Sequence, residues 1–115
     1  MKIAIVGSRC LTDIDLDKYI RIDNGINRIT EIVSGGAVGI DTRAAEYAKR
    51  HGLTLTEFLP QYERYGRAAP IVRNKEIVDY ADKVIVFWNG ASKGTLSVIK
   101  YSEKVGKHVE VVLIK

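Results

Sequence analysis

Hydroxyl-bearing and cationic side chains lie beside glycines in three separate segments of the chain: 7–9, 34–42 and 90–95. Hydroxyls and cations are the groups that proteins use to hydrogen-bond phosphate oxygens. The candidates are Ser8, Arg9, Ser34, Thr42, Ser92, Lys93 and Thr95. The chemistry that these residues predict is the binding of a ligand that carries a phosphate.

The middle segment couples a strand to a helix through a glycine turn. Ile32-Val33 is a short apolar run, and Gly35, Gly36 and Gly39 separate it from a helical pattern. Glycine lets a ligand approach the backbone closely, and the start of a helix offers unpaired N–H groups and partial positive charge. Such a turn is a ready anion site. Taken alone, it is equally consistent with a tight turn that binds nothing.

Asp41 falls in the first turn of the helix that follows these glycines. A carboxylate repels a phosphate, so we expect a different role for it. It can accept hydrogen bonds from loop N–H groups, or it can accept one from a ribose hydroxyl. The structural role is favoured over the ribose contact.

The hydrophobic pattern alternates between strands and helices along the whole chain. The expected strands are 2–6, 32–33, 53–59, 83–88 and 108–114, and the expected helices after the first are 40–50, 71–80 and 96–105. The first helix is predicted to follow Asp13 or Asp15, either of which can cap it, with an interruption at Asn24-Gly25. Residues 60–70 are predicted to be irregular. This order predicts an α/β protein with one open, mostly parallel five-stranded sheet, helices on both faces and one domain over residues 1–115.

Six of the ten glycines follow the first, second and fourth strands: Gly7, Gly35, Gly36, Gly39, Gly90 and Gly94. In an open parallel sheet these positions share the carboxyl edge, where ligands bind at the reversal of strand order. Arg73, at the start of the third helix, is expected to reach the same crevice. The pattern is neither the dinucleotide fingerprint nor a P-loop, because only one glycine follows the first strand and no Gly-Lys-Ser/Thr follows any glycine run.

Composition excludes few functions. The net charge of +4 is compatible with an anionic ligand or nucleic acid, but the basic residues are scattered. Cys10 is the one cysteine, no apolar run is long enough to span a membrane, and the chain starts in a strand without a signal-peptide pattern. We therefore expect a cytoplasmic protein with no membrane partner. No cofactor and no metal site are predicted; His51, at a helix end, is interpreted as a partner of the helix dipole.

Two tyrosines and two arginines lie close together in the segment 60–70: Tyr62, Arg64, Tyr65 and Arg67. They are arranged as if to flank a base and a phosphate, as in proteins that bind single-stranded nucleic acid. A surface loop packed by its own aromatic side chains explains them equally well.

Three stretches resemble one superfamily: residues 32–52, residues 65–90 and Ser92-Lys93-Gly94-Thr95 with the helix and strand after it. They are similar to the SLOG superfamily, which includes the DNA-processing protein A (Smf) core and the Lonely Guy phosphoribohydrolases. The most similar group is its small stand-alone bacterial and phage branch, often labelled YspA-like or DUF2493. The resemblance implies a Rossmann-like fold with a nucleotide or nucleotide-derived ligand over the glycine loops, and it adds Asn74, next to Arg73, to the candidate site.

The resemblance also separates three functions. Lonely Guy enzymes hydrolyse nucleoside 5′-monophosphates with an arginine that matches Arg73 and a glutamate three residues after Gly-Thr, where this chain has Val98. Without that carboxylate, a binding or sensing module is favoured over a nucleoside-phosphate N-glycosidase. Single-stranded DNA binding, as in the DNA-processing proteins, is the third hypothesis. Pairing into a homo-oligomer, which members often achieve through helices, is also implied.

Overall fold

The structure, a computed structural model, describes residues 1–8, 11, 13–20, 28–36 and 39–114. Five strands form one sheet in the order β3-β2-β1-β4-β5, and every neighbouring pair is parallel. The strands are β1 (Lys2–Gly7), β2 (Glu31–Ser34), β3 (Thr54–Glu57), β4 (Lys83–Trp88) and β5 (His108–Leu113). The predicted α/β class is confirmed, and the sheet is parallel throughout.

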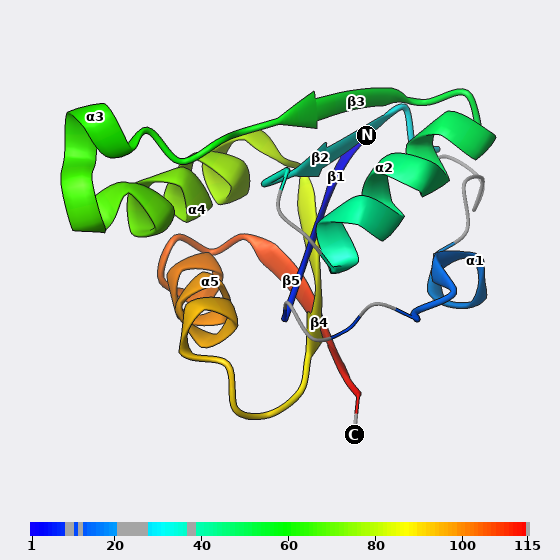
Figure 1. Ribbon diagram of the computed structural model, residues 1–115. Helices are drawn as coiled ribbons and strands as arrows, with labels where there is room; N and C mark the ends of the chain where they lie inside the picture. The colour runs from blue at the N-terminus through cyan, green and yellow to red at the C-terminus, as the bar shows by residue number, and fades with distance from the viewer. Residues whose placement is uncertain (9–10, 12, 21–27, 37–38, 115) are drawn as a thin grey trace.

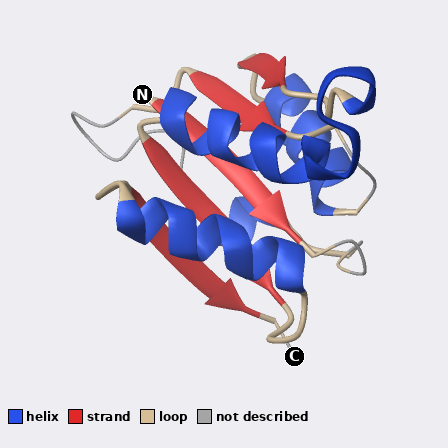
Figure 2. Ribbon diagram, turned by 90° about the vertical axis from the view of Figure 1, so that its left-hand side faces the viewer, coloured by secondary structure: helices blue, strands red, loops and turns tan. Residues whose placement is uncertain are grey.

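Helices cover both faces of this sheet (Figures 1 and 2). They are α1 (Leu16–Tyr19), α2 (Ile40–Arg50), α3 (Tyr62–Tyr65), a 3₁₀ turn η1 (Gly66–Ala68), α4 (Ala69–Tyr80) and α5 (Lys93–Lys104). In Figure 1, α1 and α2 lie on one side of the strands, and α4 and α5 lie on the other. The result is a three-layer α/β/α, Rossmann-like fold.

Alternation along the central strand divides the core into two layers. Ile3 and Ile5 of β1 belong to a cluster that includes Tyr47 of α2, whereas Ala4 belongs to one that includes Val78 of α4 and Val98 of α5. Successive side chains of a strand point to opposite faces, so a near-continuous apolar run fits a strand that is covered on both.

The order in which strands are added to the sheet reverses between β1 and β4, although all strands are parallel. From β1 the chain passes through α1 to β2 on one side, and from β4 it passes through α5 to β5 on the other. The two connections therefore diverge above the carboxyl ends of these neighbouring strands. In open parallel sheets this divergence leaves a crevice in which ligands bind.

The first helix is shorter than its pattern predicted. Asp15 caps α1, as one of the two expected residues, but the helix ends at Tyr19 because Ile20 is extended (φ −122°, ψ 127°). Ile20 and Ile29 are nevertheless buried in the core layer beneath α2. Both of these buried residues lie outside α1. The predicted interruption at Asn24-Gly25 lies outside the described residues.

Residues 60–70 were expected to be irregular, and that prediction is wrong. They contain α3, η1 and the first two residues of α4. Pro70 occupies the first turn of α4, where the missing N–H of proline costs no hydrogen bond. Gly66 has a positive φ of 56° and separates α3 from α4. Proline and glycine here mark helix boundaries rather than a loop.

Among the described residues, no helix is both long and apolar enough to cross a membrane.

Glu31 links β2, β3 and α4, and it gives a pH-dependent prediction. The hydroxyls of Tyr80 and Thr56 donate hydrogen bonds of 2.6 and 2.7 Å to its carboxylate. These bonds, that of Tyr80 first, lower the pKa of Glu31 below its ordinary 4.5. Because the folded pKa is lowered, the stabilisation is present above pH 4.5 and is lost as the pH falls through the folded value. We expect Glu31→Gln to destabilise the protein at neutral pH by an amount that shrinks in acid.

Urea denaturation at pH 7 and at steps below pH 5 measures this difference. Glu63→Gln, which changes an exposed glutamate of α3, is the control and should leave the pH dependence as it is. A deficit for Glu31→Gln that stays constant down to pH 3 would contradict the prediction.

Candidate functional site

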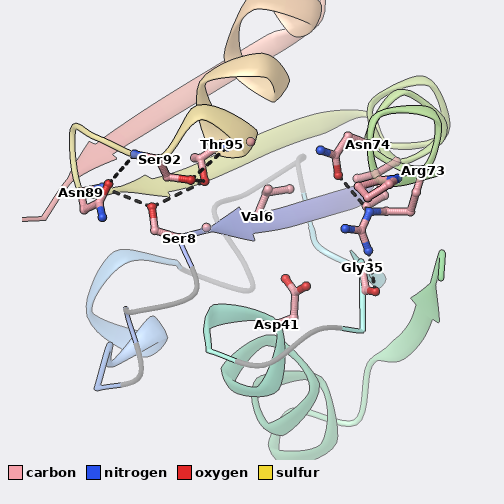
Figure 3. Close-up of a pocket in the computed structure, with 13 residues that line it drawn as sticks. Val6, Ser8, Gly35, Asp41, Arg73, Asn74, Asn89, Ser92 and Thr95 are labelled. Atoms are coloured by element: carbon pink, nitrogen blue, oxygen red, sulfur yellow. Dashed lines mark hydrogen bonds between the residues drawn. The ribbon is translucent and has the colours of Figure 1, made fainter. Parts of the chain in front are cut away.

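A cavity of about 470 Å³ opens at the carboxyl ends of β1 and β4, at the point where the connections diverge. Figure 3 shows its polar side chains in two groups on either side of Val6, with Asp41 between the groups on a third side. The lining residues are Val6, Gly7, Ser8, Gly35, Asp41, Pro70, Arg73, Asn74, Ile77, Asn89, Ser92, Gly94 and Thr95. The loops after β1, β2 and β4 and the start of α4 all contribute to it.

Most of the residues expected from the sequence meet in this cavity. Nine of them line it: Gly7, Ser8, Gly35, Asp41, Arg73, Asn74, Ser92, Gly94 and Thr95. Ser34, Gly36, Gly39 and Gly90 do not belong to the lining, and Arg9 lies outside the described residues. Asn89 is a lining residue that sequence reasoning missed. Its position could have identified it, because Asn89 is the first residue after β4, the strand with the strongest sequence pattern.

The first polar group is a cluster of hydroxyls. Ser8 and Thr95 are almost fully buried, with 1% and 4% of their surface exposed. The Thr95 hydroxyl lies 3.5 Å from that of Ser8 and 3.1 Å from that of Ser92. The N–H of Asn89 donates to the Ser8 hydroxyl at 3.4 Å. Hydroxyl protons rotate, so this cluster can present donors or acceptors to a ligand.

The loop that carries Ser92 is fixed by two side chains at the end of β4. The Asn89 side-chain oxygen accepts hydrogen bonds of 2.9 Å from the N–H groups of Ala91 and Ser92. The indole N–H of Trp88 donates to the Ser92 carbonyl at 3.1 Å. These three hydrogen bonds hold the loop in a defined conformation ahead of α5.

The amino terminus of α5 opens into the cavity beside the hydroxyl cluster. Ser92 caps the helix, and its hydroxyl accepts from the N–H of Thr95. Within the described part of the chain, the N–H groups of Lys93 and Gly94 make no hydrogen bond. Unpaired N–H groups at a helix start carry partial positive charge. Gly94 adds access, because a Cβ built on it meets nothing within 4 Å.

The second polar group is centred on Arg73. Its Nη1 donates to the carbonyls of Gly35 at 2.8 Å and Phe58 at 3.4 Å, and its Nε donates to the Asn74 side-chain oxygen at 2.9 Å. The guanidinium thus ties α4 to the chain just beyond β2 and β3. A Cβ at Gly35 would lie 2.5 Å from Nη1, so a larger residue there would displace the guanidinium. Nη2 is left without a hydrogen bond to any described residue.

The other glycines shape turns or packing. Gly36, Gly39 and Gly90 have φ values of 69°, 85° and 86°, which side-chain-bearing residues rarely adopt. Ser34 is buried behind the turn, and its hydroxyl accepts from the N–H of Gly36 at 3.2 Å. At Gly7, a Cβ would lie 2.6 Å from the Cγ2 of Ile40. Gly7 therefore lets β1 pack against α2.

One carboxylate belongs to the described lining of the cavity. Asp41 is the one carboxylate among the described lining residues, and its Oδ2 would lie 3.2 Å from a Cβ at Gly35. Val98, where Lonely Guy enzymes carry glutamate, is 1% exposed and packs in the apolar layer between the sheet and α5. A side chain at position 98 therefore belongs to the core in this chain.

Comparison with known protein families gave a match over part of the chain. Residues 1–54 match the family model described as DNA recombination-mediator protein A. These residues contain β1, β2, α2 and the first two of the three glycine segments. No curated protein and no solved structure matched the chain significantly.

Proposed function

The chain belongs to the SLOG superfamily, and from this premise we propose that it binds a nucleotide or nucleotide-derived phosphate ligand in the cavity above β1 and β4. The observation that carries the proposal is the composition of the lining. A hydroxyl cluster and an open helix start lie on one side, and a guanidinium and an amide lie on the other. Small-molecule sites combine a few convergent polar groups of this kind with apolar walls.

The phosphate belongs at the amino terminus of α5. The unpaired N–H groups of Lys93 and Gly94 and the hydroxyls of Ser92 and Thr95 are the donors that a phosphate needs. Asp41 lies away from this group, on the α2 side of the cavity (Figure 3). A ribose hydroxyl fits there better than a phosphate does, because the carboxylate accepts hydrogen bonds and repels anions.

Binding without turnover is the simpler form of this function. Cleavage of an N-glycosidic bond passes through a cationic sugar, which a nearby carboxylate stabilises. Val98 is in the core, and Asp41 is the one carboxylate on the described lining. An N-glycosidase activity therefore requires Asp41, and the enzyme alternative is tested by Asp41→Asn in an assay for released base.

Single-stranded DNA binding is the second candidate, favoured by the family match. On the described surface, Tyr62 is 57% exposed and the Arg64 guanidinium lies 5.2 Å from the Tyr65 ring centre. Exposed aromatic rings with nearby cations suit base stacking and phosphate contacts.

We further propose that the chain falls in the small stand-alone YspA-like branch.

A thermal-shift panel tests the proposed function. We expect at least one nucleoside phosphate, NAD or ADP-ribose derivative or cyclic nucleotide to stabilise the protein. A ligand at 100 times its dissociation constant adds about 2.7 kcal/mol, enough to raise the melting temperature by several degrees. Inorganic phosphate and a short single-stranded oligonucleotide are measured in the same panel for comparison. No stabilisation by any nucleotide at millimolar concentration would contradict small-molecule binding, and salt-sensitive stabilisation by the oligonucleotide alone would favour the DNA candidate.

A further inference from the structure

The β5 edge of the sheet has a row of backbone groups that no described residue pairs with. The N–H of Ile114 donates to the Trp88 carbonyl at 2.8 Å, and Trp88 is in register with Leu113. Backbone groups of successive strand residues point to opposite sides, so Val112 and Ile114 direct theirs toward β4. It follows that Val109, Val111 and Leu113 direct theirs outward, away from the sheet.

The same three residues share one face of the strand, and all are apolar. Val111 is 43% exposed and Leu113 is 52% exposed, while Val109 packs partly against the core. A long edge strand with apolar side chains and free N–H and C=O groups is a template for pairing with another strand. The opposite edge is different, because β3 has four residues and ends in the carboxylate of Glu57.

We propose that β5 pairs antiparallel with β5 of a second copy of this chain, about a two-fold axis at Val111. In this register Val111 faces Val111 of the other copy, and Val109 faces its Leu113. Each outward residue thus meets an outward residue, giving three pairs that exchange two hydrogen bonds each. The apolar side chains of both strands form one continuous stripe on a ten-stranded sheet.

Charge and hydrogen bonding select this register over its neighbours. An axis at Glu110 would set that carboxylate directly opposite its own copy, and like charges in direct cross-strand positions are destabilising. An axis at Val112 would pair Val111 with Leu113 and leave Val109 without a partner inside β5 of the other copy. With the axis at Val111, Glu110 faces Val112 of the other copy and keeps its own ion pair, at 3.9 Å, with Lys83.

The mass in solution tests the proposal, with the full chain at concentrations from roughly 1 μM to 1 mM. Sedimentation equilibrium should give twice the 12.8 kDa of one chain as concentration rises. Val111→Lys places two like charges at the axis and should shift dimerisation at least tenfold in concentration. Val111→Pro removes an outward N–H that β4 does not use, so the strand tolerates it and the protein should be monomeric. Circular dichroism establishes whether each variant is folded. If Val111→Pro does not fold, the result for Val111→Lys decides the test.

Disulfide trapping tests the register, in a Cys10→Ser background. Directly opposed residues of a hydrogen-bonded pair have Cα atoms about 5.5 Å apart, within disulfide range, so Val111→Cys should cross-link under mild oxidation. Glu110→Cys is the control: its two copies are diagonal, about 7–8 Å apart, and should cross-link poorly. A monomer at every concentration, a dimer that survives Val111→Lys, or preferential cross-linking of Glu110→Cys would each overturn the proposal.

Discussion

Replacing Gly94 by alanine is expected to weaken ligand binding at least tenfold while leaving the free protein as stable as before, or more so. The glycine is the second residue of α5, and a Cβ there meets no atom within 4 Å. Alanine favours helix over glycine by about 0.5–1 kcal/mol. The same methyl group stands at the cavity wall, beside the N–H groups that a phosphate would contact.

The measurement pairs calorimetric titration of the best ligand from the thermal-shift panel with urea denaturation of the free protein. Lys100→Ala, at an exposed site on α5, controls for helix propensity without altering the cavity. Gly7→Ala is the contrasting variant, because its methyl group would lie 2.6 Å from Ile40 and 2.9 Å from the Phe87 carbonyl. Such overpacking costs about 1–3 kcal/mol of stability. Unchanged affinity in Gly94→Ala would place the phosphate elsewhere.

The sequence predicted the strands and the edge of the sheet that carries the cavity because those features follow from local patterns. The residues of β4 were predicted at their observed bounds, and the glycines after β1, β2 and β4 mark the carboxyl edge. Parallel strands separated by helices bring these turns together whatever the side chains are. The alternation of strands and helices therefore predicted where the cavity lies, even though its lining residues are spread from residue 6 to residue 95.

What the sequence could not predict is the use made of each residue. Gly7 and Gly35 were both expected to leave room for a ligand, but Ile40 fills the space beside one and Arg73 fills it beside the other. Arg73 was expected to contact a ligand, and most of its donors bind backbone carbonyls and Asn74. These are contacts between residues up to 38 positions apart. Spacing along the chain does not encode them.

Arg73 is expected to hold the cavity in shape, and its replacement should cost more stability than a surface arginine does. Its Nη1 satisfies the Gly35 and Phe58 carbonyls. Hydrogen bonds to charged groups contribute about 1.5–3 kcal/mol. We therefore expect Arg73→Met to lower the free energy of unfolding by about that amount and to weaken ligand binding as well. Arg67→Met, at an exposed arginine of η1, should change stability by less than about 0.5 kcal/mol.

A double-mutant cycle between Arg73 and Gly35 separates this positioning role from a ligand contact alone. Gly35→Ala places a methyl group 2.5 Å from Nη1 and 2.9 Å from Cζ, so in the wild-type background it must displace the guanidinium. In the Arg73→Met background a flexible side chain without donors replaces it, and the same methyl group should cost less. We expect a coupling energy of at least about 0.5 kcal/mol, measured by urea denaturation without ligand. Additive effects would mean that the arginine does not require the glycine, and Arg73 would then be assigned to the ligand through its Nη2 alone.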